Sequence, residues 1–277
     1  MSSPLRIGLF GIGLDAYWPQ FTGLKERLEG YVARVAEKLA RPGVEIVNLG
    51  LVDNSDRAFA AGREFRQRDV DLIVLYVTTY ALSSTVLPVV LRAKVPVIVL
   101  NLAPQAAIDY AKFNALGDRT KMTGEWLAHC SACPVPEIAN VFRRSGIAFH
   151  QITGMLEGDP ACWREVDAWV EAGKVAARMQ GNRLGLMGHY YSGMLDIYSD
   201  LTLQCATFGT DIELLEVDEL AALRREVPAA AVADRLAEFR KIFDVQADCP
   251  EADLAEAART SVALDRMVAK HRLGSLA

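Results

Sequence analysis

Short apolar runs that alternate with longer amphipathic segments are the feature that most constrains how this chain folds. The apolar runs are rich in β-branched residues and have the length of buried parallel strands; they cover 5–11, 44–52, 70–78, 95–102 and 147–153. Helical patterns separate or follow them over 23–40, 55–68, 82–93, 136–145 and 160–180. This repeated order predicts an α/β fold with a doubly wound, mostly parallel, Rossmann-like sheet and right-handed crossovers.

A second α/β unit is predicted from about residue 182 onward. Strand patterns occur at 183–188 and 211–217, and helical patterns at 194–208, 218–225, 229–243 and 251–270. The last residues, Ser275-Leu-Ala277, begin another strand. Because two clear strands are fewer than a stable parallel sheet usually has, we expect an N-terminal domain over 1–181 and a second, incomplete domain over 182–277.

Composition and charge narrow the classes of partner. With 51% hydrophobic and 23% charged residues, the chain can bury a globular core. It has neither a signal-peptide pattern nor an apolar stretch of membrane-spanning length, so we expect a cytoplasmic protein. The 30 basic and 35 acidic residues give a net charge of -5 and form no Lys/Arg-rich block. This balance argues against nucleic acid or a membrane surface as partner and leaves a small molecule or another protein chain.

The chain has five cysteines, and Cys130 and Cys133 form a Cys-Ser-Ala-Cys motif. Without an export signal, reduced thiols are expected. A zinc site would need a second Cys pair or a His-x-x-x-His partner, and the sequence has neither. A thioredoxin-like redox site would need a strand directly before the motif, whereas residues 119–128 have a helical pattern. We therefore interpret the two cysteines as buried or pocket-lining thiols.

The first predicted strand ends in a glycine-rich turn, Gly11-Ile-Gly-Leu-Asp-Ala16, which fits the dinucleotide fingerprint G-x-G-x-x-A. Asp53, at the end of the second strand, could then hold a ribose. However, Tyr17-Trp-Pro19 prevents a helix from beginning inside the motif, and Asp53 lies about twice as far along the chain as the fingerprint expects. A nicotinamide-dependent oxidoreductase is therefore the weakest of the alternatives.

Aromatic and polar side chains follow several of the predicted strands. In a parallel sheet these positions lie at the carboxyl edge, where ligands bind. We predict a crevice between the two units at this edge, and the aromatic rings and the carboxylate of the first turn suit a polyol as its ligand. The candidate substrate-binding residues are Asp15, Tyr17, Trp18, Gln20, Tyr80, His129, Cys130, Cys133, His189 and Tyr191.

Four motifs in this order resemble the L-arabinose isomerase and L-fucose isomerase family: 11–21, Thr78-Thr-Tyr80, 129–137 and 188–200. The resemblance covers nearly the whole chain. It implies an aldose–ketose isomerase that acts on a pentose or deoxyhexose with the help of a divalent metal, usually Mn2+. It also implies a homo-oligomer whose active sites are shared between subunits.

The resemblance also assigns roles to single residues. Tyr17 matches a tyrosine that reaches into a neighbouring subunit's active site, and Tyr80 matches a pocket phenylalanine. Cys130 and Cys133 match a glutamine and a histidine that contact the sugar, and Tyr191 matches a methionine. The family's metal-binding carboxylates and active-site histidines lie beyond the position that matches Ala277. We therefore expect an N-terminal, substrate-orienting portion of an isomerase, inactive alone and without catalytic or metal-binding residues of its own. A free-standing, non-catalytic sugar-binding or regulatory module is the alternative.

Overall fold

The computed structural model describes residues 4–188 and 190–277 of the chain. It confirms the predicted α/β fold class. The chain divides into two compact units between Ala177 and Arg178, and each unit is described by itself. No helix of the described residues combines the length and the apolar character needed to cross a membrane.

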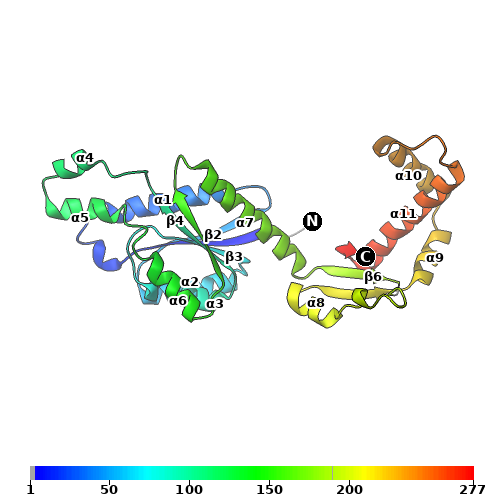
Figure 1. Cartoon of the computed structure of the whole chain (residues 1–277), viewed down its shortest axis with the longest axis horizontal. Coiled ribbons are helices and arrows are strands. Elements are labelled where there is room, and N and C mark those ends of the chain that lie inside the picture. The colour runs from blue at the N-terminus through cyan, green and yellow to red at the C-terminus, as the bar shows by residue number, and fades with distance from the viewer. Residues whose placement is uncertain (1–3, 189) are drawn as a thin grey trace. The chain divides into compact units, whose positions relative to one another are not determined.

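The first unit is built on a five-stranded parallel sheet with the strand order β2-β1-β3-β4-β5 (Figure 1). The strands are β1 (Leu5–Ile12), β2 (Val44–Val52), β3 (Leu72–Tyr76), β4 (Val97–Ala103) and β5 (Phe149–Met155). All five strands predicted for this unit are therefore confirmed. The strand order reverses between β1 and β3, which is the topological switch point where open α/β sheets bind ligands.

Helices cover both faces of this sheet. Their bounds are α1 (Leu24–Leu39), α2 (Ser55–Gln67), α3 (Leu87–Ala93), α6 (Val135–Arg144) and α7 (Pro160–Met179). One core lies on the face covered by α1 and α7, and its buried residues include Leu28, Val166 and Ile7 of β1. The other core lies under α2, α3 and α6, where Phe65 and Phe142 are fully buried. Because β1 is buried on both faces, its sequence is a nearly continuous apolar run.

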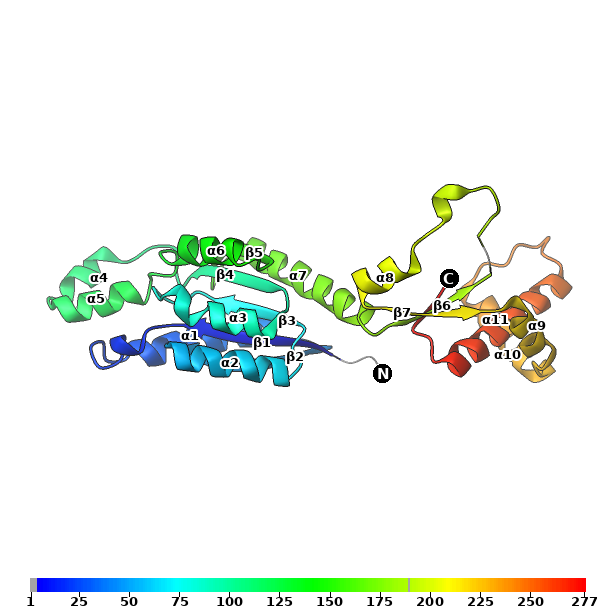
Figure 2. The same ribbon diagram turned by 90° about the horizontal axis from the view of Figure 1, so that it is seen from below.

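The connection from β4 to β5 contains two further helices, α4 (Tyr110–Ala115) and α5 (Arg119–Leu127). Figures 1 and 2 show both of them beyond the ends of the strands. The side chains of Asp109 and Asp118 cap α4 and α5 by accepting the backbone N–H groups of Lys112 and Lys121. The helical pattern over 119–128 is confirmed, whereas α4 was not predicted because a helix of this length has almost no periodic signal.

Replacing Gly62 by alanine is expected to destabilise the first unit by about 1–3 kcal/mol, as overpacking does in a close-packed core. Gly62 lies where α2 meets α3, and an added Cβ would be 2.8 Å from the Pro88 carbonyl oxygen and 3.0 Å from that of Val89. Gly30, in α1, is the control: a Cβ there meets nothing within 4 Å. Gly30→Ala should therefore stabilise the chain by about 0.5–1 kcal/mol. Denaturant unfolding of both variants measures the difference, and equal effects would contradict this account of Gly62.

The second unit has a three-stranded parallel sheet with the order β7-β6-β8. Its strands are β6 (Arg183–Met187), β7 (Asp211–Leu215) and β8 (Ser275–Leu276), so the predicted strand at the end of the chain is confirmed. The helices α9 (Val217–Arg225), α10 (Ala229–Ile242) and α11 (Glu251–His271) also match the predicted pattern. Met267 of α11 is fully buried in a small core beside the sheet.

The helix predicted over 194–208 is wrong in its first half. The structure has a short 3-10 helix at Leu195–Ile197, and α8 spans only Leu201–Phe208. Asp200 causes the late start, because its side chain accepts the backbone N–H of Leu203 at 2.9 Å and caps α8 there. The apolar residues before it fit a helical pattern, but Tyr198 has an extended backbone.

Candidate functional site

The loops that follow β1 and β3 meet at the switch point of the first sheet. The first begins with a short 3-10 helix, Asp15–Tyr17, and the second contains Thr78, Thr79 and Tyr80. The buried Thr78 hydroxyl donates a hydrogen bond to the Ile12 carbonyl and joins the two loops. Two of the predicted clusters of site residues are therefore neighbours because of the strand order.

Trp18 closes the glycine-rich turn. Its indole Nε1 donates a 2.8 Å hydrogen bond to Asp53 Oδ2, and a Cβ added at Gly13 would lie 2.7 Å from the indole ring. The ring therefore lies against the turn where a dinucleotide would place its pyrophosphate. Asp53 is engaged by Trp18, and α1 begins only at Leu24. These contacts argue against nucleotide binding at this turn.

Tyr17 lies within electrostatic range of Tyr80 and Cys130, and Tyr17 and Tyr80 both pack against the core under α1 and α7. Burial raises the pKa of the Tyr17 hydroxyl, and the proximity of Tyr80 and Cys130 raises it further. The Tyr17 ring packs edge-on against Trp18, with centroids 6.3 Å apart, and against Phe21 at 5.8 Å. Residues from three separate loops that were predicted as site residues thus form one cluster in the structure.

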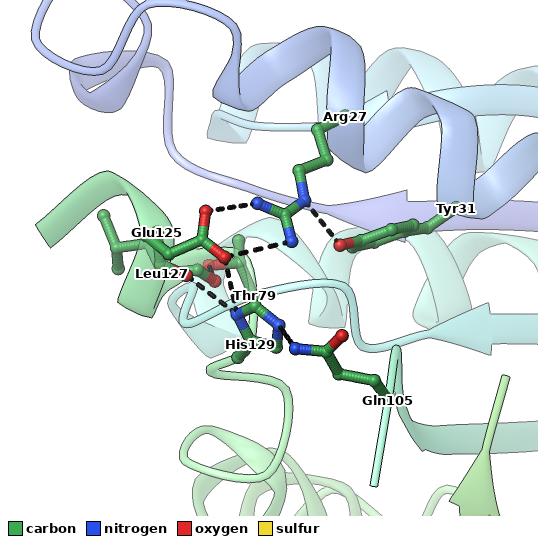
Figure 3. Close-up of polar contacts among 7 residues, drawn as sticks. All are labelled: Arg27, Tyr31, Thr79, Gln105, Glu125, Leu127 and His129. Atoms are coloured by element: carbon green, nitrogen blue, oxygen red, sulfur yellow. Dashed lines mark hydrogen bonds and ion pairs between the residues drawn. The ribbon is translucent and has the colours of Figure 1, made fainter. Parts of the chain in front are cut away.

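His129 belongs to a hydrogen-bond network that Figure 3 shows. Its side chain is only 6% exposed. Nδ1 lies 2.9 Å from the Glu125 carbonyl oxygen, and Nε2 lies 2.8 Å from Gln105 Nε2. Because a carbonyl oxygen can only accept, Nδ1 carries the proton and Nε2 accepts from the Gln105 amide. The imidazole is therefore held in one tautomer and one orientation.

Arg27 and Glu125 connect α1 to α5. Two guanidinium nitrogens of Arg27 contact the Glu125 carboxylate, at 2.6 and 3.3 Å, and Nε donates to the Tyr31 hydroxyl at 2.7 Å. The same carboxylate lies 3.7 Å from Nδ1 of His129, so Glu125 stands between the arginine and the histidine (Figure 3). Thr79 adds a second connection, since its hydroxyl donates to the Leu127 carbonyl at 2.7 Å. The wall of the site formed by α5 is thus fixed by polar contacts.

A pocket of about 610 Å³ lies between the start of α1 and α5. This volume is in the range of small-molecule sites. We call it the α1–α5 pocket, and its lining combines an aromatic ring, aliphatic side chains, hydroxyl and amide groups, and charged groups. The lining residues are Gln20, Phe21, Thr22, Gly23, Leu24, Arg27, Leu116, Asp118, Thr120, Lys121, Gly124, Glu125 and Ala128.

The remaining predicted site residues lie in different surroundings. Asp15 is exposed, and Gln20 lines the α1–α5 pocket while its amide donates to the Ala16 carbonyl at 2.6 Å. Tyr191 is 72% exposed in the second unit. His189 lies outside the described residues. The predicted crevice between the two units stays a prediction.

Four residues that line the pocket were not predicted as site residues: Arg27, Glu125, Phe21 and Thr120. Glu125 and His129 have the i, i+4 spacing of neighbours on a helix, which could have drawn attention to the carboxylate. The pairing of Arg27 with Glu125 spans 98 residues and has no local signal. Phe21 directly follows the aromatic cluster of the first turn but was counted only as part of the motif.

The described residues do not fit the divalent metal that the family resemblance implies. No group of three or more His, Cys, Asp or Glu side chains in the described part of the chain is placed to hold a metal ion. Both nitrogens of His129 are engaged by Glu125 and Gln105. We therefore assign no step of a reaction to a metal held by these residues.

Comparisons with known proteins do not assign the chain to a family. The chain matches no protein-family model and is not significantly similar to any curated protein.

Proposed function

We propose that the α1–α5 pocket and the aromatic cluster beside it bind an open-chain sugar. We further propose that this chain is the substrate-orienting portion of an aldose–ketose isomerase of the L-arabinose and L-fucose isomerase type. The observation that carries the proposal is the balance of charge in a pocket that is otherwise suited to a polyol. The sequence resemblance supports the class of reaction.

The charged groups of the pocket favour a neutral ligand. Arg27 and Lys121 contribute two positive charges, and Asp118 and Glu125 contribute two negative charges. The Arg27 guanidinium is paired with the Glu125 carboxylate at 2.6 Å, so its charge is not available for a phosphate. A pocket of this kind offers hydrogen bonds without a net field, which is the requirement for a sugar rather than a sugar phosphate.

The remaining lining groups support the same class of ligand. Phe21 offers an aromatic ring, whose face packs against the C–H side of a sugar, and it adjoins Tyr17 at a centroid distance of 5.8 Å. Gln20, Thr22 and Thr120 supply amide and hydroxyl groups that can donate to or accept from sugar hydroxyls. Small-molecule sites typically combine a few convergent polar groups with a mostly apolar lining.

Orientation of the substrate is the role that we propose for this chain. Fixing an open-chain sugar in the reactive geometry is a large part of catalysis, and a misplacement of about 1 Å can reduce the rate a hundredfold. The metal chemistry of the family requires ligands that the described residues do not supply. The homo-oligomer with shared active sites, to which Tyr17 would contribute, is part of the same proposal.

Calorimetric titration of the 277-residue chain tests the proposal. L-Arabinose, L-fucose or the open-chain polyol arabinitol should bind, and a pentose 5-phosphate should bind more weakly. Phe21→Ala should weaken sugar binding about fivefold, because an aromatic contact contributes about 1 kcal/mol. Tyr110→Ala is the control, since Tyr110 is 68% exposed on α4 and outside the pocket lining.

Preferential binding of the phosphate, or no binding of any sugar, would contradict the proposal. The alternative of a non-catalytic sugar-binding module predicts the same binding. An aldose–ketose assay with Mn2+ separates the two only when this chain is combined with the family's metal-binding residues. A substrate-orienting portion of an isomerase then supports conversion of the sugar, and a non-catalytic module does not.

A further inference from the structure

The two thiols of the Cys130–Cys133 loop lie next to each other between α5 and α6. Their Sγ atoms are 2.9 Å apart, and both residues are free thiols in the structure. A disulfide has an S–S distance of about 2.05 Å, so the sulfurs need to approach by less than about 1 Å to form one. The spacing of the two cysteines therefore permits a covalent bond with little movement of the loop.

The two thiols differ in accessibility. Cys130 is buried, at 5% exposure, whereas Cys133 is exposed. Burial, followed by the neighbouring Cys133, raises the pKa of Cys130 to about 12. Cys130 is thus protonated and shielded at neutral pH, and Cys133 is the thiol that a soluble reagent can reach. This asymmetry is that of an attacking and a resolving cysteine in thiol–disulfide exchange.

A metal site does not account for this arrangement. A soft metal ion held by two thiolates needs further ligands, and His129, which precedes Cys130 in the chain, has both ring nitrogens engaged by the Glu125 carbonyl and the Gln105 amide. The described part of the chain offers no third ligand in position. Simple core packing accounts for Cys130 but not for the exposed Cys133.

We propose that Cys130 and Cys133 are a reversible dithiol–disulfide site that exchanges with low-molecular-weight disulfides. The Cys133 thiolate attacks one sulfur of the disulfide R–S–S–R, forms a mixed disulfide and releases R–S⁻. The Cys130 sulfur then loses its proton to solvent and attacks Cys133 Sγ, which forms the Cys130–Cys133 bond and releases the second R–S⁻. The protein loses two electrons and two protons, and the small disulfide is reduced to two thiols. The site is independent of what the α1–α5 pocket binds.

Oxidation would act on the loop that carries His129. In the reduced form the Cys130 thiol contacts Cys133, and the backbone amide of Tyr80 hydrogen-bonds the Cys130 sulfur. A covalent bond between the two cysteines would fix the residues that link His129 to the start of α6. The Cys130–Cys133 pair is therefore placed so that its oxidation can affect the cluster around Tyr17 and Tyr80.

Incubation of the full chain with oxidised glutathione, followed by intact-mass analysis and peptide mapping, tests the site. At the Cys130–Cys133 loop the wild-type chain should lose two hydrogen atoms and give one mapped bond between these two cysteines, which reduced dithiothreitol reverses. Cys130→Ser should stop at a stable mixed disulfide of glutathione with Cys133. Cys133→Ser should form neither product at this loop. Cys249→Ser, which removes another exposed thiol, should give the same Cys130–Cys133 bond as the wild type.

A wild-type chain that keeps glutathione on Cys133, as the Cys130→Ser variant does, would overturn the proposal. So would a wild-type chain in which Cys133 stays reduced while Cys249 reacts. The mapping of the wild-type chain alone decides between these outcomes, so the test stands even if a serine variant folds poorly.

Discussion

Replacing Trp18 by alanine is expected to lower the free energy of unfolding by about 3 kcal/mol, at the lower end of the cost of emptying a buried aromatic site. Trp18 is only partly buried, but its ring packs against the core under α1 and α7 and covers Gly13. The substitution also removes the 2.8 Å hydrogen bond to the buried Asp53 carboxylate. A buried acceptor that loses a partner adds to the cost.

Trp18→Phe is the matched comparison, because it keeps an aromatic ring at this position and removes the indole N–H together with part of the ring surface that covers Gly13. It should cost more than the about 1 kcal/mol of one hydrogen bond and less than Trp18→Ala. Denaturant unfolding at neutral pH measures both variants. If Trp18→Ala were as stable as the wild type, the indole would have no structural role, and ligand binding alone would explain its presence in the first turn.

Replacing Arg27 by alanine should weaken sugar binding at least tenfold, which corresponds to about 1.4 kcal/mol. Arg27 holds α5 against α1 through its two contacts with Glu125, and α5 forms one wall of the α1–α5 pocket. Its loss also leaves Glu125 without its guanidinium partner and gives the pocket a net negative charge. Arg27→Lys should restore only part of the affinity, because an ammonium group cannot make the paired contacts of a guanidinium.

Arg34→Ala is the control for the loss of one positive charge from α1. Arg34 pairs with Glu37 and Glu157 at the surface and does not line the pocket. It should leave sugar affinity unchanged, and calorimetric titration compares the variants. Equal losses of sugar affinity in Arg27→Ala and Arg34→Ala would mean that the Arg27–Glu125 pair does not shape the pocket.

Much of the fold could be predicted because its signals are local. The five strands of the first sheet are continuous apolar runs, and α2 begins where the Asn54 side chain accepts the backbone N–H of Arg57. The short α4 and the late start of α8 depend on single capping residues, Asp109 and Asp200, which an apolar pattern does not reveal. These are positions where capping chemistry overrides the period of the sequence.

From the sequence, only the site residues that follow the end of a predicted strand could be located. Tyr17, Tyr80 and Cys130 were placed at one edge because the carboxyl ends of parallel strands meet there, and the structure brings them together. The wall of the pocket depends on Arg27 and Glu125, which are far apart in sequence and pair only after α1 and α5 are in place. Such a tertiary contact has no periodicity and no motif by which a single sequence could reveal it.

Mapping arabinitol binding by NMR on the 277-residue chain tests the central claim most directly. The account predicts that the amide signals that shift on titration belong to the lining of the α1–α5 pocket, above all Gln20, Phe21, Gly124 and Ala128. Signals of α2 and α3, on the other face of the sheet, should stay in place. Shifts confined to residues outside the pocket, or no shifts at saturating arabinitol, would contradict the proposal that this chain orients an open-chain sugar.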